Sequence, residues 1–185
     1  MSQEVTSGHD LNPSQDAELR EQEAAKREAA ELISALKEKE GKKALVLVVD
    51  DEAKKRRDVA QYFTQEAPAR DTGYVLSLKP DGYSAVSLYQ AFREQEAPEQ
   101  PNKVIVLLDG NLDSSGDYIR GDQVAKKLIT MSTENGWEAP YLVGISTYSR
   151  ANDFLKGFFP EQHIASVNPL LRDFKVVFDA IDAKL

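Results

Sequence analysis

Three runs of aliphatic residues, each followed by polar side chains, dominate the hydrophobic pattern of the chain. They are LVLVVDDE (residues 45–52), KVIVLLD (103–109) and YLVGIS (141–146). Because apolar and polar residues do not alternate within these runs, they are typical of strands buried on both faces, as in a parallel sheet. Two weaker strands are expected at YVLSL (74–78) and HIASV (163–167).

The segments between and after these strands have apolar residues at helical spacing. Helices are expected at residues 52–65, 83–96, 122–132, 149–159 and 169–185. Five strands that alternate with five helices predict an α/β protein with right-handed crossovers and a doubly wound, five-stranded parallel sheet.

The N-terminal part has a different pattern. Residues 1–12 are polar and aperiodic, so a disordered tail is expected there. Residues 13–41 are rich in Ala, Glu, Lys and Leu, which predicts a helical extension that begins after Asn12 and ends at Gly41. The globular domain would then comprise residues 43–185.

The apolar residues of this extension favour no single role. Leu19, Ala29, Ile33 and Leu36 fall near one helical face, but polar residues interrupt that face in its first half. The helix could pack Ile33 and Leu36 on the domain, or it could form a homodimer or bind a partner. Both interpretations stay open at this point.

Composition narrows the possible functions. The 185-residue chain has a net charge of −8 and no cysteine, which excludes disulfides and thiolate metal sites. Its basic residues are scattered among acids, so direct nucleic-acid binding is not expected. The sequence begins without a recognisable signal peptide, and no apolar run approaches the roughly 20 residues of a membrane span, so a cytoplasmic location is expected.

Acidic and hydroxyl residues stand at the carboxyl ends of the predicted strands. Asp50 and Asp51 follow the first strand, Asp109 follows the third, and Ser146 and Thr147 follow the fourth. In a doubly wound sheet these ends meet at the ligand-binding edge. Carboxylates that converge repel one another, and a hard cation such as Mg²⁺ relieves the repulsion. The simpler alternative is that the first acids only cap the following helix.

The order of these motifs resembles the receiver domain of bacterial response regulators. The similar segments are VLVVDDE, KPDGYSAVSLYQ, VIVLLDGNL, YLVGIST and NPL, and the resemblance covers roughly residues 43–185. It implies a flavodoxin-like fold and a signalling function in a two-component phosphorelay.

The resemblance also implies roles for individual residues. Asp109 would accept a phosphoryl group from a sensor histidine kinase or a phosphotransfer protein. Asp51 would ligate Mg²⁺ directly, Asp50 would help through water, and the backbone carbonyl of Asn111 would complete the protein's ligands. Ser146 matches the hydroxyl residue that contacts the phosphoryl oxygen, and Thr147 is expected to belong to the same phosphoryl-contacting switch.

The sequence departs from the family in three places. Asn168 stands where the family has a lysine, and Ala165 stands where it tends to have an aromatic residue. The loop after Asp109 is long and acidic; Asp113 and Asp117 could bring further carboxylates near the metal, but solvation of both is the favoured expectation. Loss of a cation at residue 168 would weaken the site electrostatically, and Arg150 is the candidate substitute.

Three functions follow from these observations. The first is a phosphorylatable signalling receiver without enzymatic turnover. No effector domain is expected after Leu185, so its output would reach an unknown downstream protein through protein contacts or the N-terminal helix. The second is a degenerate receiver that acts as a protein-binding adaptor without phosphate. The third is a phosphoaspartyl phosphohydrolase, which Asn111 disfavours because such enzymes commonly have an acid at that position.

Overall fold

The central feature of the fold is a parallel sheet with the strand order β2-β1-β3-β4-β5. A computed structural model describes residues 13–66, 70, 72–97, 101–112, 120–147, 149–167 and 174–185. In this part of the chain the strands are β1 (Lys42–Val49), β2 (Thr72–Lys79), β3 (Lys103–Leu108), β4 (Tyr141–Gly144) and β5 (His163–Ser166), and all neighbours pair in parallel. The predicted doubly wound, flavodoxin-like sheet is therefore confirmed.

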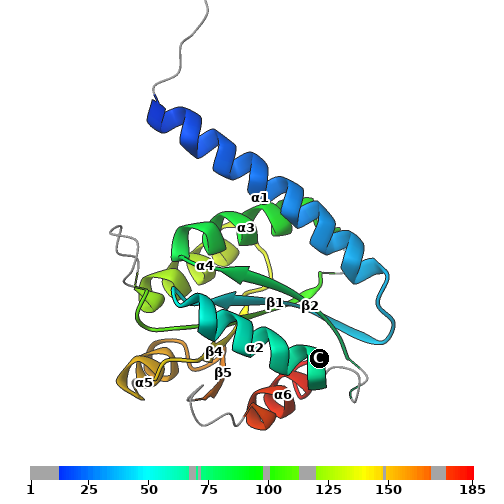
Figure 1. The fold of residues 1–185 in the computed structure, drawn as a ribbon, viewed down its shortest axis with the longest axis vertical. Helices are drawn as coiled ribbons and strands as arrows, with labels where there is room; N and C mark the ends of the chain where they lie inside the picture. Colours follow the sequence, from blue (N-terminus) through cyan, green and yellow to red (C-terminus); the bar gives the residue numbers. More distant parts are fainter. Residues whose placement is uncertain are drawn as a thin grey trace, which may run out of the picture.

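Helices cover both faces of this sheet. They are α1 (Pro13–Lys37), α2 (Ala53–Glu66), α3 (Gly82–Gln95), α4 (Gly121–Asn135), α5 (Ser149–Phe158) and α6 (Lys175–Asp182). Figure 1 shows α1, α3 and α4 on one side of the sheet and α2 and α6 on the other. The order in which strands are added reverses between β1 and β3, because the chain adds β2 on one side of β1 and then places β3 on the other side. Ligands bind at this point in open α/β sheets.

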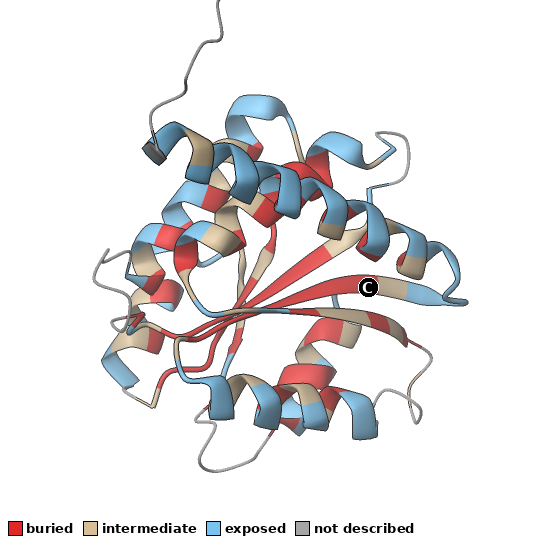
Figure 2. Cartoon of the chain, turned by 45° about the horizontal axis from the view of Figure 1, so that its top comes forward, coloured by how far each residue is buried: buried red, intermediate tan, exposed pale blue. Residues whose placement is uncertain are grey.

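The aliphatic runs are buried from both sides, as the sequence pattern predicts. Along β1, Leu45 and Leu47 pack with α1, α3 and α4, whereas Val46 and Val48 pack with α2 and α6. None of these four side chains has any exposed surface. Figure 2 shows the same burial along the central strands. The ladder pairs Val49, the last residue of β1, with Lys79 of β2 and Leu108 of β3, so the three strands end at the same level.

Helix α1 packs on the domain beside α3 rather than standing apart from it. Its buried residues are Ala25, Ala29, Leu32 and Leu36, which recur at steps of three and four. Leu19 is 45% exposed, and Ile33 is only partly buried. Ile33 and Leu36 thus pack on the domain as predicted, and Leu32 is buried beside them. The helix ends at Lys37, not at Gly41; Gly41 adopts a φ of 70° after the intervening turn.

Polar contacts also fasten α1 to the sheet. The Glu28 carboxylate accepts hydrogen bonds from Ser77 Oγ at 2.6 Å and from Lys79 Nζ at 2.5 Å, and both donors belong to β2. The Gln95 side chain at the end of α3 donates to the carbonyl of Lys26 at 3.0 Å. Because hydrogen bonds depend on geometry more than apolar contacts do, these contacts specify how α1 is placed on the domain. Formation of a homodimer through α1 stays a prediction.

The C-terminal helix α6 is held to β2 through one carboxylate. Asp182 accepts hydrogen bonds from Thr72 Oγ1 at 3.1 Å and Tyr74 Oη at 2.8 Å, and it also pairs with Arg70. Burial alone would raise the pKa of Asp182, but the bonds from Tyr74 and Arg70 outweigh it and lower the pKa. The predicted start of this helix, at residue 169, lies outside the described residues.

Within the described ranges, no helix has both the length and the apolar character needed to cross a membrane.

Candidate functional site

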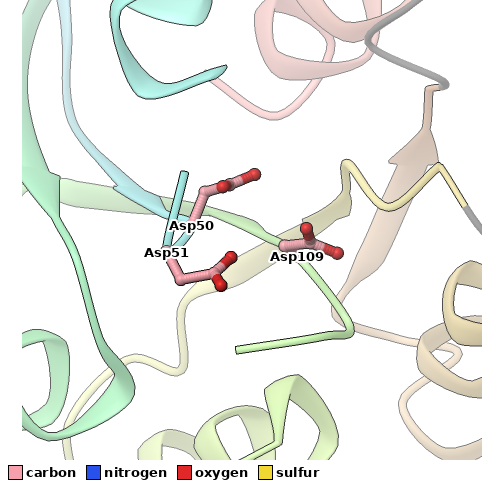
Figure 3. Close-up of side chains that lie close together, drawn as sticks. All are labelled: Asp50, Asp51 and Asp109. Carbon is pink, nitrogen blue, oxygen red and sulfur yellow. The ribbon is translucent and has the colours of Figure 1, made fainter. Parts of the chain in front are cut away.

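The carboxyl ends of β1 and β3 bring three aspartates together. Asp50 and Asp109 directly follow these adjacent strands, and backbone hydrogen bonds extend the ladder beyond the strands: Asp50 N donates to Lys79 O at 3.2 Å, and Asp109 N donates to Val49 O at 3.0 Å. Carboxylate oxygens of Asp50, Asp51 and Asp109 lie within 4.8 Å of one another. Figure 3 shows the three side chains close together at the strand ends. The sheet itself therefore positions the cluster, which we call the acidic site.

Asp50 is the most deeply buried member of the acidic site, with no exposed surface. Its Oδ1 accepts a hydrogen bond from Glu52 N at 2.7 Å. Its Oδ2 is buried and has no hydrogen-bond partner among the described residues. The pKa of Asp50 is raised from 3.8 to about 7, mainly by burial; the Glu52 amide opposes the rise, and the nearby charge of Asp109 adds to it. An ionised Asp50 is therefore costly unless a cation approaches Oδ2.

Lys55, in the first turn of α2, places its ammonium among these acids. Its Nζ lies 2.6 Å from Glu52 Oε1, 3.3 Å from Asp109 Oδ2 and 3.9 Å from Asp50 Oδ2, and the side chain is only 16% exposed. Burial lowers the pKa of Lys55, but the hydrogen bond to Glu52 and the charges of Asp50 and Asp109 outweigh this effect and raise it. Lys55 is thus a charged member of the acidic site.

Asp109 is buried and closely surrounded by backbone. Its Oδ1 accepts a hydrogen bond from Asn111 N at 3.2 Å. Gly121, which begins α4, donates its N–H to Gly110 O at 3.3 Å. A Cβ added at Gly121 would meet the carbonyl oxygen of Asp109, and one added at Gly110 would meet the Cβ of Ala151. Gly121 and Gly110 are therefore needed because neighbouring atoms leave no room for a side chain at either position.

An open pocket continues from Asp109 toward α5. Its lining includes Gly110, Asn111, Arg120, Ser146, Arg150 and Phe154. Ser146 is buried, and its backbone exchanges two hydrogen bonds with the Asn152 side chain: Ser146 N donates to Oδ1 at 3.1 Å, and Nδ2 donates to Ser146 O at 3.0 Å. Thr147 follows as a partly exposed residue. Ser146 and Arg150 therefore share the pocket beside Asp109.

Several predicted features of the site remain outside the structural description. Asn168 and the acidic-loop residues Asp113 and Asp117 lie outside the described residues. Ala165 is buried on β5. The roles predicted for Asn111, Ser146 and Thr147 toward metal or phosphoryl group stay predictions.

The donor set of the acidic site fits a hard divalent cation. Three carboxylates converge, and Asp50 Oδ2, which accepts no hydrogen bond from the described residues, supplies a buried oxygen with unused acceptor capacity. Mg²⁺ prefers such oxygen ligands and usually binds through one or two carboxylates while keeping several waters. Helix capping accounts for Asp50 Oδ1, which accepts from Glu52 N, but it leaves Oδ2 unexplained.

Sequence reasoning missed Lys55 as a member of this site. Glu52 and Lys55 are three residues apart, a spacing that usually indicates an exposed helical ion pair. The useful signal was the position of the lysine in the first turn of a helix that begins directly after two strand-end aspartates. From there its long side chain reaches back over the edge of the sheet.

Neither the protein-family profiles nor the curated protein sequences contain a match to this chain. One solved structure with a similar fold is the bacteriophytochrome response regulator AtBRR, with 19% sequence identity, a TM-score of 0.47, and coverage of 77% of this chain and 91% of that chain. At this level of identity the similarity says nothing about function. The strand order β2-β1-β3-β4-β5 is itself the flavodoxin-like order that receiver domains have, so the predicted resemblance is confirmed at the level of fold.

Proposed function

We propose that this chain is a receiver-type signalling switch that accepts a phosphoryl group on Asp109. Mg²⁺ would be held by Asp50, Asp51 and Asp109 together with the backbone carbonyl of Asn111. The observation that carries this proposal is the buried Oδ2 of Asp50, which accepts no hydrogen bond from the described residues and lies 3.9 Å from the Lys55 ammonium, beside Asp51 and Asp109. A purely structural acidic cluster would gain nothing from this arrangement, because a buried oxygen that accepts no hydrogen bond costs free energy.

The proposed reaction needs little covalent chemistry from the protein. A carboxylate oxygen of Asp109 attacks the phosphorus of a phosphohistidine on a sensor kinase or phosphotransfer protein. The new O–P bond forms as the P–N bond breaks, and the imidazole nitrogen keeps the electron pair. When bound, Mg²⁺ supplies charge neutralisation for the carboxylates and the incoming phosphoryl oxygens.

The residues around Asp109 support this chemistry. The Asn111 amide orients one carboxylate oxygen of Asp109, so the attacking group is held in place before a donor arrives. Ser146, in the neighbouring pocket, would donate a hydrogen bond from its hydroxyl to a phosphoryl oxygen. Thr147, the next residue, would contact the phosphoryl group as part of the same switch. Arg120 and Arg150 line the same pocket and supply positive charge that Asn168 does not. Phosphorylation of Asp109 would then change the surface around this pocket, and a downstream protein would recognise the changed surface.

Intact-mass measurement tests the proposal directly. The protein is incubated with Mg²⁺ and a small acyl-phosphate donor such as acetyl phosphate. We expect a gain of one phosphoryl group that disappears in Asp109→Asn and when the metal is chelated. Asp58→Asn is the matched control, because Asp58 is an exposed aspartate on α2. No gain of mass in the wild type, under conditions where the protein binds Mg²⁺, would refute the proposal.

Lys55 favours a second candidate, the phosphate-independent adaptor. Its ammonium lies 3.3 Å from Asp109 Oδ2 and partly neutralises the site without any metal. In this case Asp109→Asn and chelation would leave partner binding unchanged, and the acyl-phosphate donor would add no mass. The two candidates therefore make opposite predictions for the same measurement.

A further inference from the structure

We propose that Lys55 is a built-in competitor of the divalent cation at the acidic site. In the resting state its ammonium neutralises Asp109 and Asp50, and a metal ion binds only as the ammonium moves away from Asp109 and is retained by Glu52. This inference rests on the proposed function, because it concerns the same metal site. It assigns to Lys55 and Glu52 a regulatory role that the acidic triad alone does not have.

The distances place Lys55 between an inner and an outer set of acids. The inner contacts are 3.3 Å to Asp109 Oδ2 and 3.9 Å to Asp50 Oδ2, and both acceptors are buried. The outer contact is 2.6 Å to Glu52 Oε1, whose side chain is 58% exposed. The ammonium is therefore already bonded to a solvent-exposed carboxylate, and it can leave Asp109 without losing its closest partner.

The inner position of the ammonium conflicts with a bound metal ion. A cation that ligates Asp109 and one that lies 3.3 Å from the same carboxylate would be only a few ångströms apart. Like charges at such a separation repel strongly in a partly buried site. The carboxylates that attract Mg²⁺ also hold the ammonium, so the two cations draw on the same electrostatic attraction.

Glu52 distinguishes competition from simple neutralisation. It stands within the helical turn of Lys55, and it is the only one of the three acceptors that is exposed. If Glu52 retains the ammonium when metal binds, removal of its charge should hold Lys55 more firmly on Asp109. Glu52→Gln is then expected to weaken Mg²⁺ binding, whereas Lys55→Met is expected to tighten it.

Calorimetry with Mg²⁺ and electron paramagnetic resonance with Mn²⁺ measure this competition on the full-length chain. We expect Lys55→Met to bind Mg²⁺ at least about tenfold more tightly than the wild type, which corresponds to one moderately screened charge contact. Lys55→Arg should stay close to the wild type. Lys54→Met is the matched control: Lys54 is the adjacent exposed lysine, so the net charge changes equally, and we expect an affinity change below about twofold.

The double variant completes the test. In the Lys55→Met background, Glu52→Gln should weaken binding much less than it does in the wild type, because the ammonium that Glu52 retains is gone. Lys55→Gln is a second neutral variant for the case that Met alters the packing of α2, with folding checked by circular dichroism.

Each result has a distinct meaning. Equal affinity in the wild type and Lys55→Met, or weaker binding in Lys55→Met, would overturn the competition and leave the proposed metal site standing. Tightening of similar size in Lys54→Met would also overturn it, because the effect would then be long-range. Absence of metal binding in every variant would overturn both the competition and the metal site.

Discussion

Asp50→Asn offers the most direct test of the electrostatics of the acidic site. The substitution keeps the shape of the side chain, and its amide oxygen can still accept the hydrogen bond from Glu52 N. It removes a charge that is fully buried and beside Asp109. We therefore expect the metal-free variant to be more stable than the metal-free wild type, in contrast to most core substitutions.

The pKa of Asp50 sets both the size and the pH range of this effect. Its folded-state pKa of about 7 lies above the ordinary value of 3.8. The folded state then binds more protons than the unfolded state between these values, so the free energy of unfolding falls as pH rises through this range. A difference of about three units between the two pKa values lowers the free energy of unfolding by about 4 kcal/mol above pH 7. About 2 to 3 kcal/mol of this decrease occurs between pH 5 and pH 8.

Urea unfolding of both proteins at pH 5 and pH 8, with a chelator present, measures this difference. The stability advantage of Asp50→Asn should grow by about 2 to 3 kcal/mol from the lower to the higher pH. Asp58→Asn neutralises an exposed carboxylate on α2, and its stability difference from the wild type should be nearly the same at pH 5 and pH 8. An advantage of equal size at both pH values would refute the assignment of a raised pKa to Asp50.

Addition of Mg²⁺ at pH 8 extends the same experiment. A ligand that binds only the folded state stabilises it by about 2.7 kcal/mol at a concentration one hundred times its Kd. The wild type should regain stability in this way, and Asp50→Asn should gain clearly less. Equal stabilisation of the two proteins would show that Asp50 does not take part in holding the ion.

Three further predictions concern residues around the site and the core. Gly121→Ala should leave the protein folded but reduce phosphorylation by acetyl phosphate at least about tenfold by intact mass, because its Cβ would displace the Asp109 carbonyl; undiminished labelling would contradict this. Tyr89→Phe removes a buried hydroxyl that bonds to α4 and to the loop before β4. It should lower the free energy of unfolding in urea by about 1 to 2 kcal/mol, and an unchanged free energy would contradict this. Asp182→Asn should destabilise the chain at neutral pH, and the wild type should lose its advantage as pH falls below about 4, because the pKa of Asp182 is lowered in the folded state. Circular dichroism during acid titration measures this, and parallel curves for the two proteins would disprove it.

The sheet could be predicted from the sequence because its strands follow one strong rule. Aliphatic runs without alternation indicate burial on both faces; β1 contains the aliphatic residues 45–49 of the first run, and β3 contains residues 103–108 of the second. The acidic site followed from the same rule, since carboxyl ends of parallel strands share an edge. No detailed side-chain packing was needed to place Asp50 and Asp109 together.

The parts that sequence reasoning missed depend on distances between elements. The charge pattern of α2 does not distinguish an exposed lysine from one that bends back over the sheet edge, so Lys55 was not identified as part of the site. Similarly, the face of α1 that is buried depends on its rotation against α3. Leu32, not Ile33, is the residue that this packing buries more fully. Helical periodicity alone is too coarse to separate adjacent positions.

The packing of α1 decides how the chain can be shortened. Ala25, Ala29, Leu32 and Leu36 belong to the same apolar cluster as the β1 residues on that side of the sheet. A version that starts at the predicted domain boundary, residue 43, would expose this surface to water and invite aggregation. Deletions that stop before Ala25 remove mainly polar helix and leave the cluster covered, so they are the suitable starting points for crystallisation or for fusion of a reporter protein.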